Sequence, residues 1–265
     1  EHMYLDKPAH AVVDNAVKLT QAVGAASAKG FVNAVLRRLT AQDAQALLDR
    51  ATEGLTGDAL LEVCHSHPQW IIRAFRDALG SQELVELLER DNQAPRVTLV
   101  ARPGRIDRDE LPGEPTPWSP WGVYAERTDP GSIDAVRDGR AGVQDQGSQL
   151  MALAFSRAEV SCTDDAWLDM CAGPGGKAAL LADLLPSGAH LLAVEQHPHR
   201  AELVESALRG TPGRATVEVA DAATVEGSFS RILLDAPCAG LGVLRRRPEA
   251  RWRRQPSDIP TLTAL

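Results

Sequence analysis

The sequence is poor in cysteine and lysine and has no long apolar run, and each shortage excludes a class of protein. Its four cysteines lie far apart and form no Cys-x-x-Cys pair, so they indicate neither a zinc site nor a disulfide framework. No run of about 18 apolar residues occurs, which argues against a membrane-spanning helix. The first residues show no signal-peptide pattern. We therefore expect a cytoplasmic protein without a metal site.

The composition is that of a globular protein with a negative net charge. The 265 residues are 44% hydrophobic and 24% charged, with a formal net charge of −8. A chain of this length predicts two or three domains. The acidic balance argues against nonspecific coating of nucleic acid, but it leaves room for a local basic site. Arginine would supply that site, because lysine is rare.

The N-terminal part of the sequence has the apolar spacing of helices. Three helices are predicted within residues 8–50, and two more at 69–79 and 82–91. Arg37 and Arg38 fall in the last turn of the second helix, where cations interact favourably with the helix dipole. That position explains the pair structurally, and a contact with RNA is the alternative.

After these helices the apolar period changes to that of strands. Residues 97–101 and 122–126 each predict a strand, and the stretch between them is rich in proline, glycine and charge. We interpret this region as a small α+β module. The predicted domains are residues 1–57, which are helical, 58–130, which hold linker helices and this module, and 131–265.

From about residue 130 onward, strands alternate with helices. Alternation of this kind implies right-handed crossovers and a parallel sheet. The predicted strands are 166–171, 190–195, 215–221 and 231–235, with helices at 177–185 and 199–208 between the first three.

The first strand of this region runs directly into a glycine turn and then into a helix. Residues 169–177 read Asp-Met-Cys-Ala-Gly-Pro-Gly-Gly-Lys, which is neither a P-loop nor Gly-x-Gly-x-x-Gly. Strand, glycine turn and helix in this order are typical of a cofactor-binding loop. Asp169 precedes the glycines, where a carboxylate would repel a pyrophosphate but attract a cationic ligand such as S-adenosylmethionine. A tight turn that binds nothing is the alternative.

The other three predicted strands also end in acidic residues. Glu195 lies about 20 positions beyond the glycine turn, a spacing that suits the two hydroxyls of a ribose. Asp221 could accept a hydrogen bond from an adenine amine, and Asp235 ends the fourth strand. Each alone is usually a solvated carboxylate, but four in succession at one sheet edge indicate a pocket for adenosine with an attached cation. The pattern predicts a class I methyltransferase that uses S-adenosylmethionine.

Asp235 opens the segment Asp-Ala-Pro-Cys, in which Cys238 suggests thiol chemistry. C5 of cytosine becomes nucleophilic only after a thiolate has added to C6. A cysteine beside a methyl donor therefore favours covalent catalysis on cytosine. A small buried side chain without a chemical role is the alternative for Cys238.

A run of arginines follows this loop. Arginines around a tryptophan can neutralise phosphates and stack on a base, whereas a solvated charged face is the simpler alternative. We favour RNA binding by Arg245, Arg246, Arg247, Arg251, Trp252, Arg253 and Arg254.

These motifs resemble those of the Sun/Fmu-type 16S ribosomal RNA cytosine-5 methyltransferases, of the wider NOL1/NOP2/Sun group. The resemblance extends over the glycine loop, residues 144–150 (Gln-Asp-Gln-Gly-Ser-Gln-Leu) and residues 235–243 (Asp-Ala-Pro-Cys-Ala-Gly-Leu-Gly-Val). Residues 29–38 are similar to the end of a NusB-like helical domain. We therefore expect a multidomain fold with all-α NusB-like helices, a small RRM-like α+β module and a Rossmann-like α/β methyltransferase domain.

The resemblance implies a role for each matched residue. Glu195 and Arg200 would bind the ribose, and Asp221 the adenine. Asp235 would orient the cofactor and the cytosine, and Cys238 would assist product release. The methionine end of the cofactor would lie on the glycine loop, formed by Cys171, Ala172, Gly173, Pro174, Gly175, Gly176 and Lys177.

One motif of the resembled family is absent from the sequence. In that family the nucleophilic cysteine lies in a Thr-Cys-Ser motif beyond the Asp-Ala-Pro-Cys loop. No Thr-Cys-Ser occurs in the present sequence. We therefore expect a C-terminally truncated chain with a partial NusB-like domain, a methyltransferase domain without its last strands, and no turnover.

The sequence thus predicts methyl transfer from S-adenosylmethionine to C5 of a cytosine in 16S ribosomal RNA. The full-length protein is expected to be a monomer that acts without metal or membrane. A non-catalytic RNA-binding protein on a degenerate methyltransferase scaffold is the alternative from another class. An amine or protein methyltransferase is disfavoured, because it would carry Asn/Asp-Pro-Pro-Tyr/Phe in place of Asp-Ala-Pro-Cys.

Overall fold

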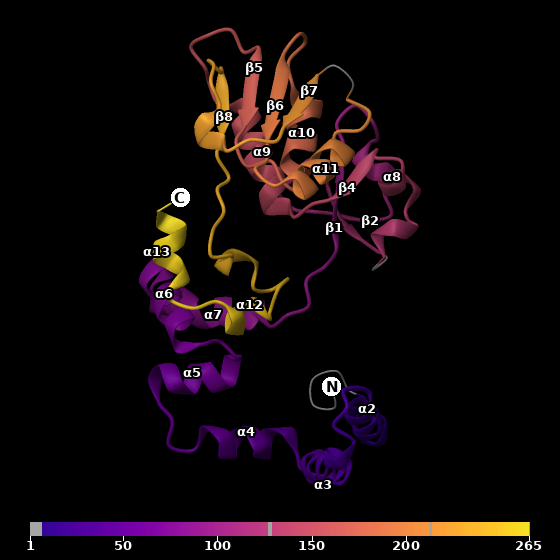
Figure 1. Cartoon of the computed structure of the whole chain (residues 1–265), viewed down its shortest axis with the longest axis vertical. Coiled ribbons are helices and arrows are strands. Elements are labelled where there is room, and N and C mark those ends of the chain that lie inside the picture. The colour runs from indigo at the N-terminus through magenta and orange to yellow at the C-terminus, as the bar shows by residue number, and fades with distance from the viewer. Residues whose placement is uncertain (1–6, 127–128, 212–213, 265) are drawn as a thin grey trace. The chain divides into compact units, whose positions relative to one another are not determined.

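The chain folds into two units that differ in secondary structure. The first, Glu1–Gln93 with Gly240–Ser257, is helical, and the second, Ala94–Ala239 with Asp258–Leu265, contains both sheets (Figure 1). The boundaries of these units differ from those of the three predicted domains. The domain boundaries stay a prediction. The computed structural model describes residues 7–126, 129–211 and 214–264.

The helical unit contains the helices that the apolar spacing predicts, and one more. They are α2 (Ala9–Ala22), α3 (Lys29–Thr40), α4 (Ala44–Thr52), α5 (Gly57–His65), α6 (Gln69–Leu79) and α7 (Ser81–Asp91). Helix α5, which begins at Gly57, is the additional one. Ile72 of α6 and Leu84 and Leu88 of α7 form a buried cluster. No helix among the described residues is long and apolar enough to cross a membrane.

A buried arginine fastens the second segment of this unit to the first. Arg251, in the short helix α12 (Ala250–Arg253), is only 4% exposed. Its Nη1 donates to Asn92 Oδ1 over 2.7 Å, and its Nη2 donates to the carbonyl of Asp91 over 2.7 Å. These bonds hold Gly240–Ser257 against the end of α7.

The strands that follow the helices form a small antiparallel sheet. They are β1 (Thr98–Ala101), β2 (Gly113–Pro115), β3 (Gly122–Ala125) and β4 (Ala141–Val143), in the order β2-β3-β1-β4. Leu99, Val123 and Ile133 lie in its core. The two predicted strands are confirmed as β1 and β3. Strands β2 and β4 have only three residues each, too few to show an apolar alternation, and the likeness to an RRM stays a prediction.

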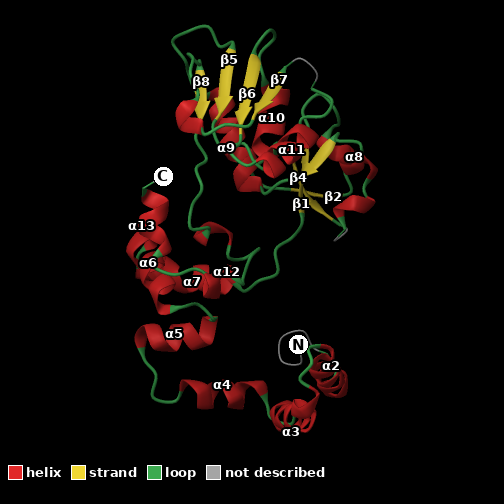
Figure 2. Cartoon of the chain, viewed as in Figure 1, coloured by secondary structure: helices red, strands yellow, loops and turns green. Residues whose placement is uncertain are grey.

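The four strands predicted beyond residue 165 form a second sheet with only parallel pairings. They are β5 (Ala166–Asp169), β6 (His190–Val194), β7 (Ala215–Glu218) and β8 (Arg231–Leu233), in the order β7-β6-β5-β8 (Figure 2). Helices α9 (Gln146–Arg157), α10 (Gly176–Leu184) and α11 (Pro198–Ala207) belong to the same unit. The predicted alternation and parallel sheet are confirmed. Leu180 and Leu181 of α10 and Trp167 of β5 are buried together in the main core.

The small sheet is joined to these helices by a buried ion pair. Arg102 follows β1, and its Nε lies 2.5 Å from Asp183 Oδ2, with both side chains 5% exposed. Its Nη2 donates to the carbonyl of Ala179, and its Nη1 to that of Ala207, each over 2.8 Å. Arg105 also pairs with Asp183, at 2.9 Å. The small sheet, α10 and α11 are therefore linked by one network, which we call the arginine junction.

Candidate functional site

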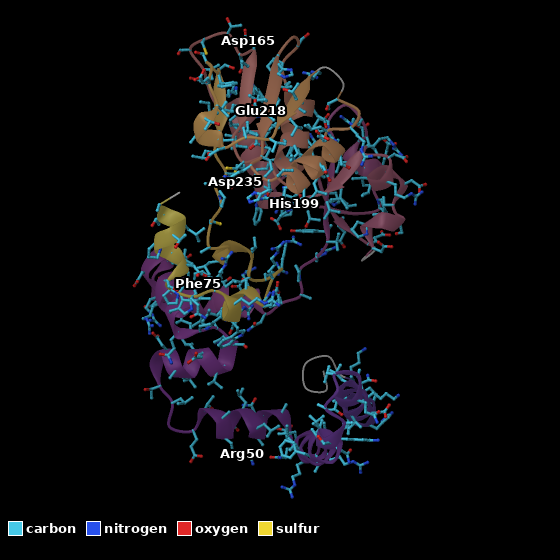
Figure 3. The ribbon with its side chains drawn as sticks, in the orientation of Figure 1. Arg50, Phe75, Asp165, His199, Glu218 and Asp235 are labelled. Atoms are coloured by element: carbon cyan, nitrogen blue, oxygen red, sulfur yellow. The ribbon has the colours of Figure 1, made fainter. Side chains whose placement is uncertain are left out.

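Acidic residues gather at the carboxyl edge of the parallel sheet. Asp169 is the last residue of β5, and Glu195, Asp221 and Asp235 follow β6, β7 and β8. With the observed strand order, they succeed one another along the edge as Asp221, Glu195, Asp169 and Asp235. Figure 3 shows Asp235 at this edge and Asp165, which precedes β5, at the opposite one. The topology thus brings the four predicted strand-end carboxylates to one edge.

The glycine loop between β5 and α10 requires glycine at its closest approach to α11. Gly175 has a φ of +107°, a conformation that L side chains rarely adopt. A Cβ atom there would lie 2.7 Å from Ala207 Cβ and 2.9 Å from Val204 Cα. Both contacts are too short for a real side chain. Conformation and packing together therefore explain this glycine, whether or not a ligand binds.

Glu195, Arg200 and Gly173 form one constellation beside the loop. Glu195 is 4% exposed, and its Oε1 accepts from the backbone N–H of His197 over 2.9 Å. Arg200 Nη1 lies 3.5 Å from Glu195 Oε2, and Arg200 Nη2 donates to the Gly173 carbonyl over 2.6 Å. A Cβ on Gly173 would lie 2.2 Å from Glu195 Oε2, so a larger residue there would displace the Glu195 carboxylate.

Glu195 is ionised in this setting. Burial by itself would raise the pKa of Glu195, but hydrogen bonds from His197 and the charge of Arg200 outweigh it and lower the pKa. A buried carboxylate that is already charged can accept hydrogen bonds from hydroxyl groups. The arrangement therefore suits a neutral polyol such as a ribose.

Asp169 is the least satisfied charged group at this edge. It is 1% exposed, and its Oδ1 accepts from the backbone N–H of Cys171 over 3.3 Å, whereas its Oδ2 is buried without a partner. Burial raises the pKa of Asp169 to about 6; Lys177 opposes the rise and Asp235 adds to it. A buried carboxylate oxygen without a partner beside a glycine loop fits a cationic ligand.

The loop after β8 is connected to the start of α10. Lys177 Nζ lies 2.6 Å from Asp235 Oδ2. Cys238 lies three residues farther along and is exposed, so it is not the buried side chain of the alternative interpretation. Burial, followed by the charges of Asp169 and Glu195, raises the pKa of Cys171, which keeps that thiol neutral.

The start of α9 and the residues just before it contain buried glutamines of two kinds. Gln149 Nε2 donates to the carbonyl of Leu99 over 3.1 Å, and its Oε1 accepts from Ser119 Oγ over 2.5 Å. Gln146 Oε1 accepts from the backbone N–H of Ser119 over 3.3 Å. Gln144 is equally buried, but neither polar atom of its amide has a partner. Two of these residues therefore bind the small sheet to α9, and one does not.

The predicted arginine run divides into exposed residues and one buried residue. Arg245, Arg246, Arg247, Trp252 and Arg253 are exposed, and Arg254 is half-buried. Arg251 differs, because its guanidinium is occupied by Asn92 and the carbonyl of Asp91 inside the helical unit. We therefore correct its assignment from RNA contact to packing.

The earlier arginine pair is compatible with both interpretations that the sequence allowed. Arg37 and Arg38 lie exposed in the last turn of α3. Arg37 Nε donates to Asn33 Oδ1 over 3.2 Å, one turn back along the helix.

Among the described residues, no group of three or more His, Cys, Asp or Glu side chains could hold a metal ion.

Two family models match the chain. Residues 160–265 match the model described as 16S rRNA methyltransferase RsmB/F, and residues 1–41 match that of the NusB family. The first match covers the glycine loop and the four strand-end carboxylates. The second agrees with the prediction of NusB-like N-terminal helices.

Curated proteins point to the same family. A putative methyltransferase of Mycobacterium tuberculosis is 44% identical over 266 residues, which are 97% of this chain and 58% of that protein. The ribosomal RNA small subunit methyltransferase B of Pasteurella multocida is 30% identical over 289 residues, 99% of this chain and 60% of that protein. The chain thus spans less than two thirds of these relatives. By these matches it is similar to RNA methyltransferases of the Sun/RsmB type.

A structural neighbour agrees with this fold. NSun6 from Pyrococcus horikoshii, solved with SFG, superposes with a TM-score of 0.62 over 74% of this chain and 76% of that one. The sequence identity is 16%, so the likeness shows the fold alone.

Proposed function

We propose that this protein transfers a methyl group from S-adenosylmethionine to C5 of a cytosine in 16S ribosomal RNA. The observation that carries the proposal is the buried, unpartnered Oδ2 of Asp169 beside the glycine loop. A cationic cofactor would supply its missing partner. The matches to rRNA methyltransferase models and relatives support RNA as the acceptor.

The cofactor would lie along the carboxyl edge of the parallel sheet. When bound, S-adenosylmethionine supplies the methyl group on a sulfonium. The glycine loop would hold its methionine end, and Glu195, with Arg200 fixed against Gly173, would accept from the ribose hydroxyls. Asp221 would accept from the adenine amine. Asp235, oriented by Lys177, would face both cofactor and cytosine. The structural neighbour's complex with SFG, an analogue of S-adenosylmethionine, supports this choice of cofactor.

The acceptor chemistry would use cysteine. A thiolate adds to C6 of cytosine, negative charge develops at C5, and after methylation a base removes the C5 proton as the thiol leaves. We propose that the exposed Cys238 assists this last step. The resembled family assigns the attack on C6 to a Thr-Cys-Ser segment, which the present sequence does not contain. We therefore expect this 265-residue chain to bind cofactor without completing the reaction.

RNA would be bound by arginines of the helical unit, all of them exposed except the half-buried Arg254. Their guanidinium groups can neutralise phosphates, and Trp252, at 55% exposure, offers a ring on which a base can stack. Buried Arg251 is left out of this set. The proposed residues are Arg37, Arg38, Arg245, Arg246, Arg247, Trp252, Arg253 and Arg254.

Calorimetry with S-adenosylmethionine tests the cofactor assignment. Wild-type protein should release heat on binding, and Asp221→Ala should bind more weakly while keeping its fold by circular dichroism. No heat from folded wild type would refute the assignment. RNA binding together with this absence of heat would favour the alternative, a non-catalytic RNA-binding protein.

A further inference from the structure

The second unit exposes one tryptophan on a tight loop. Trp118 is 72% exposed and lies between β2 and β3. Its neighbours Thr116 and Ser119 are 4% and 2% exposed. Buried residues thus flank the exposed pair Pro117 and Trp118, and the aromatic ring is left in solvent. Burying that ring on a partner would remove a large apolar surface from water.

The backbone that carries Trp118 is held by hydrogen bonds from another element. Its N–H donates to Gln146 Oε1 over 3.0 Å, and the N–H of Ser119 donates to the same oxygen over 3.3 Å. Ser119 Oγ in turn donates to Gln149 Oε1 over 2.5 Å. At the far end of the loop, a Cβ on Gly122 would lie 2.1 Å from Thr116 Oγ1. The ring is thus presented by a fixed backbone, which limits the conformational entropy lost on binding.

Two arginines line the same hollow as this tryptophan. The hollow has a volume of about 330 Å³ and is lined by Arg108, Thr116, Pro117, Trp118, Ser119, Pro120, Leu153 and Arg157. Among these described lining residues, two are cationic and none carries a carboxylate. Arg157 is exposed at the end of α9, and Arg108 Nε is 3.7 Å from the exposed Asp109.

We propose that Trp118, Arg108 and Arg157 form a binding surface for an unpaired nucleotide of RNA, which we call the tryptophan platform. A base would stack on the indole, and its phosphates would approach the two guanidinium groups. Stacking is open to any base, because each has a π-face, so the platform binds without choosing a sequence. The cationic lining favours a polyanion over a protein segment as the partner. The inference rests on the proposed function for its RNA, but it uses residues outside the proposed arginine set.

This inference gives a role to two glutamines of residues 144–150, the segment that resembles the family. Gln146 accepts from the backbone N–H of Trp118 itself, and Gln149 accepts from the hydroxyl of Ser119 beside it. They act as positioning residues that hold Trp118 in place.

Fluorescence anisotropy with the whole chain tests the platform. The probe is a fluorescein-labelled, unstructured RNA of about 12 nucleotides, a length within the range that single-stranded sites cover. Trp118→Ala should weaken binding about tenfold, and Trp118→Phe should restore most of it because a ring remains. Arg157→Gln should weaken binding and reduce the slope of log affinity against log salt by about 0.7. Phe31→Ala is the matched control, since Phe31 is also 72% exposed, and it should bind as wild type does.

The outcomes separate this inference from the proposed function. Unchanged RNA affinity in a folded Trp118→Ala variant would overturn the platform alone. Failure of wild type to bind the RNA would overturn both the platform and the RNA half of the proposed function. Calorimetry with S-adenosylmethionine should give the same heat for wild type and Trp118→Ala. If Trp118→Ala is unfolded, the same comparison is made between Trp118→Phe and Trp118→Leu, and equal affinities would refute stacking. If a proline-rich peptide binds wild type but not Trp118→Ala, and the RNA binds both proteins equally, the hollow is assigned to a protein partner instead.

Discussion

The arginine junction and the carboxyl edge of the parallel sheet both contain buried charged side chains. At the junction the buried carboxylate is paired, whereas at the edge one carboxylate oxygen is not. At the junction, the Asp183 carboxylate is met by two arginines, and Arg102 also reaches two carbonyls. At the edge, Asp169 keeps one carboxylate oxygen without any partner. A buried polar atom left unpaired costs about 1–3 kcal/mol. The Asp183 carboxylate is therefore paired within the protein, whereas Asp169 Oδ2 has no protein partner.

Opening the arginine junction should destabilise the protein most strongly. Arg102→Ala would leave Asp183 buried with Arg105 alone and would remove the hydrogen bonds to the carbonyls of Ala179 and Ala207. Removing one member of a buried ion pair costs about 3–5 kcal/mol. We expect the free energy of unfolding to fall by about 4 kcal/mol, measured by urea denaturation followed by circular dichroism.

An exposed arginine of the same unit provides the control. Arg137 pairs with Asp134 on the short helix α8 (Asp134–Arg137), with side-chain exposures of 56% and 74%. Arg137→Ala should cost about 1 kcal/mol or less, since solvent screens such pairs. If Arg102→Ala costs no more than Arg137→Ala, the junction is not a complete network.

Two glutamines near the start of α9 show the same contrast between a paired and an unpaired buried group. Gln149→Leu would remove the buried hydrogen bonds that the amide makes to the carbonyls of Leu99 and Gln144 and to the Ser119 hydroxyl, and we expect the free energy of unfolding to fall by about 2–3 kcal/mol. Gln144→Leu removes an amide that has no partner, so stability should stay within about 1 kcal/mol of wild type or rise. Thermal unfolding of the two variants measures the contrast. Equal losses would mean that Gln144 has a partner in solution.

The parallel sheet was predictable because its signal is local. Each strand is a short apolar run that ends near a carboxylate, and the glycine loop follows the first run directly. The alternation with helices then implies the sheet, and the strand-end positions of Glu195 and Asp235 follow from it. Strands β2 and β4 were not predictable in this way, because their pairing with β3 and β1 fixes them more than their own three residues do.

Burial of charged residues depended on distant contacts that the sequence does not reveal. Arg251 stands in a run of arginines and has the same local pattern as its exposed neighbours. Its position is decided by Asn92 and Asp91, about 160 positions earlier in the chain. The sequence did not single out Trp118, because a tryptophan in a proline-rich stretch gives no sign that its side chain is exposed. The roles of the predicted site residues stay predictions, because geometry alone does not show what they bind.

The smallest effect, and the most direct test of the incomplete edge, is a pH dependence. The pKa of Asp169 is raised to about 6 from its ordinary value of 3.8. Between these values the unfolded chain has lost the proton and the folded chain still holds it, so the contribution of Asp169 to stability falls as pH rises from about 4 to 6. A cationic ligand should reverse this preference, because it pairs with the ionised form. Calorimetry should therefore show S-adenosylmethionine binding about tenfold more weakly at about pH 5 than at about pH 7.5.

Two controls decide whether Asp169 causes that dependence and which cation it meets. Asp169→Asn cannot titrate, so its weaker affinity should be the same at both pH values, and a tenfold change that persists in this variant would exclude Asp169 as the cause. S-adenosylhomocysteine keeps the amino group of the cofactor but lacks the sulfonium charge. If its affinity also falls at the lower pH, Asp169 Oδ2 faces the amino group; if its affinity is level, the oxygen faces the sulfonium. Either result assigns the missing partner by charge, which is the property that separates this edge from the arginine junction.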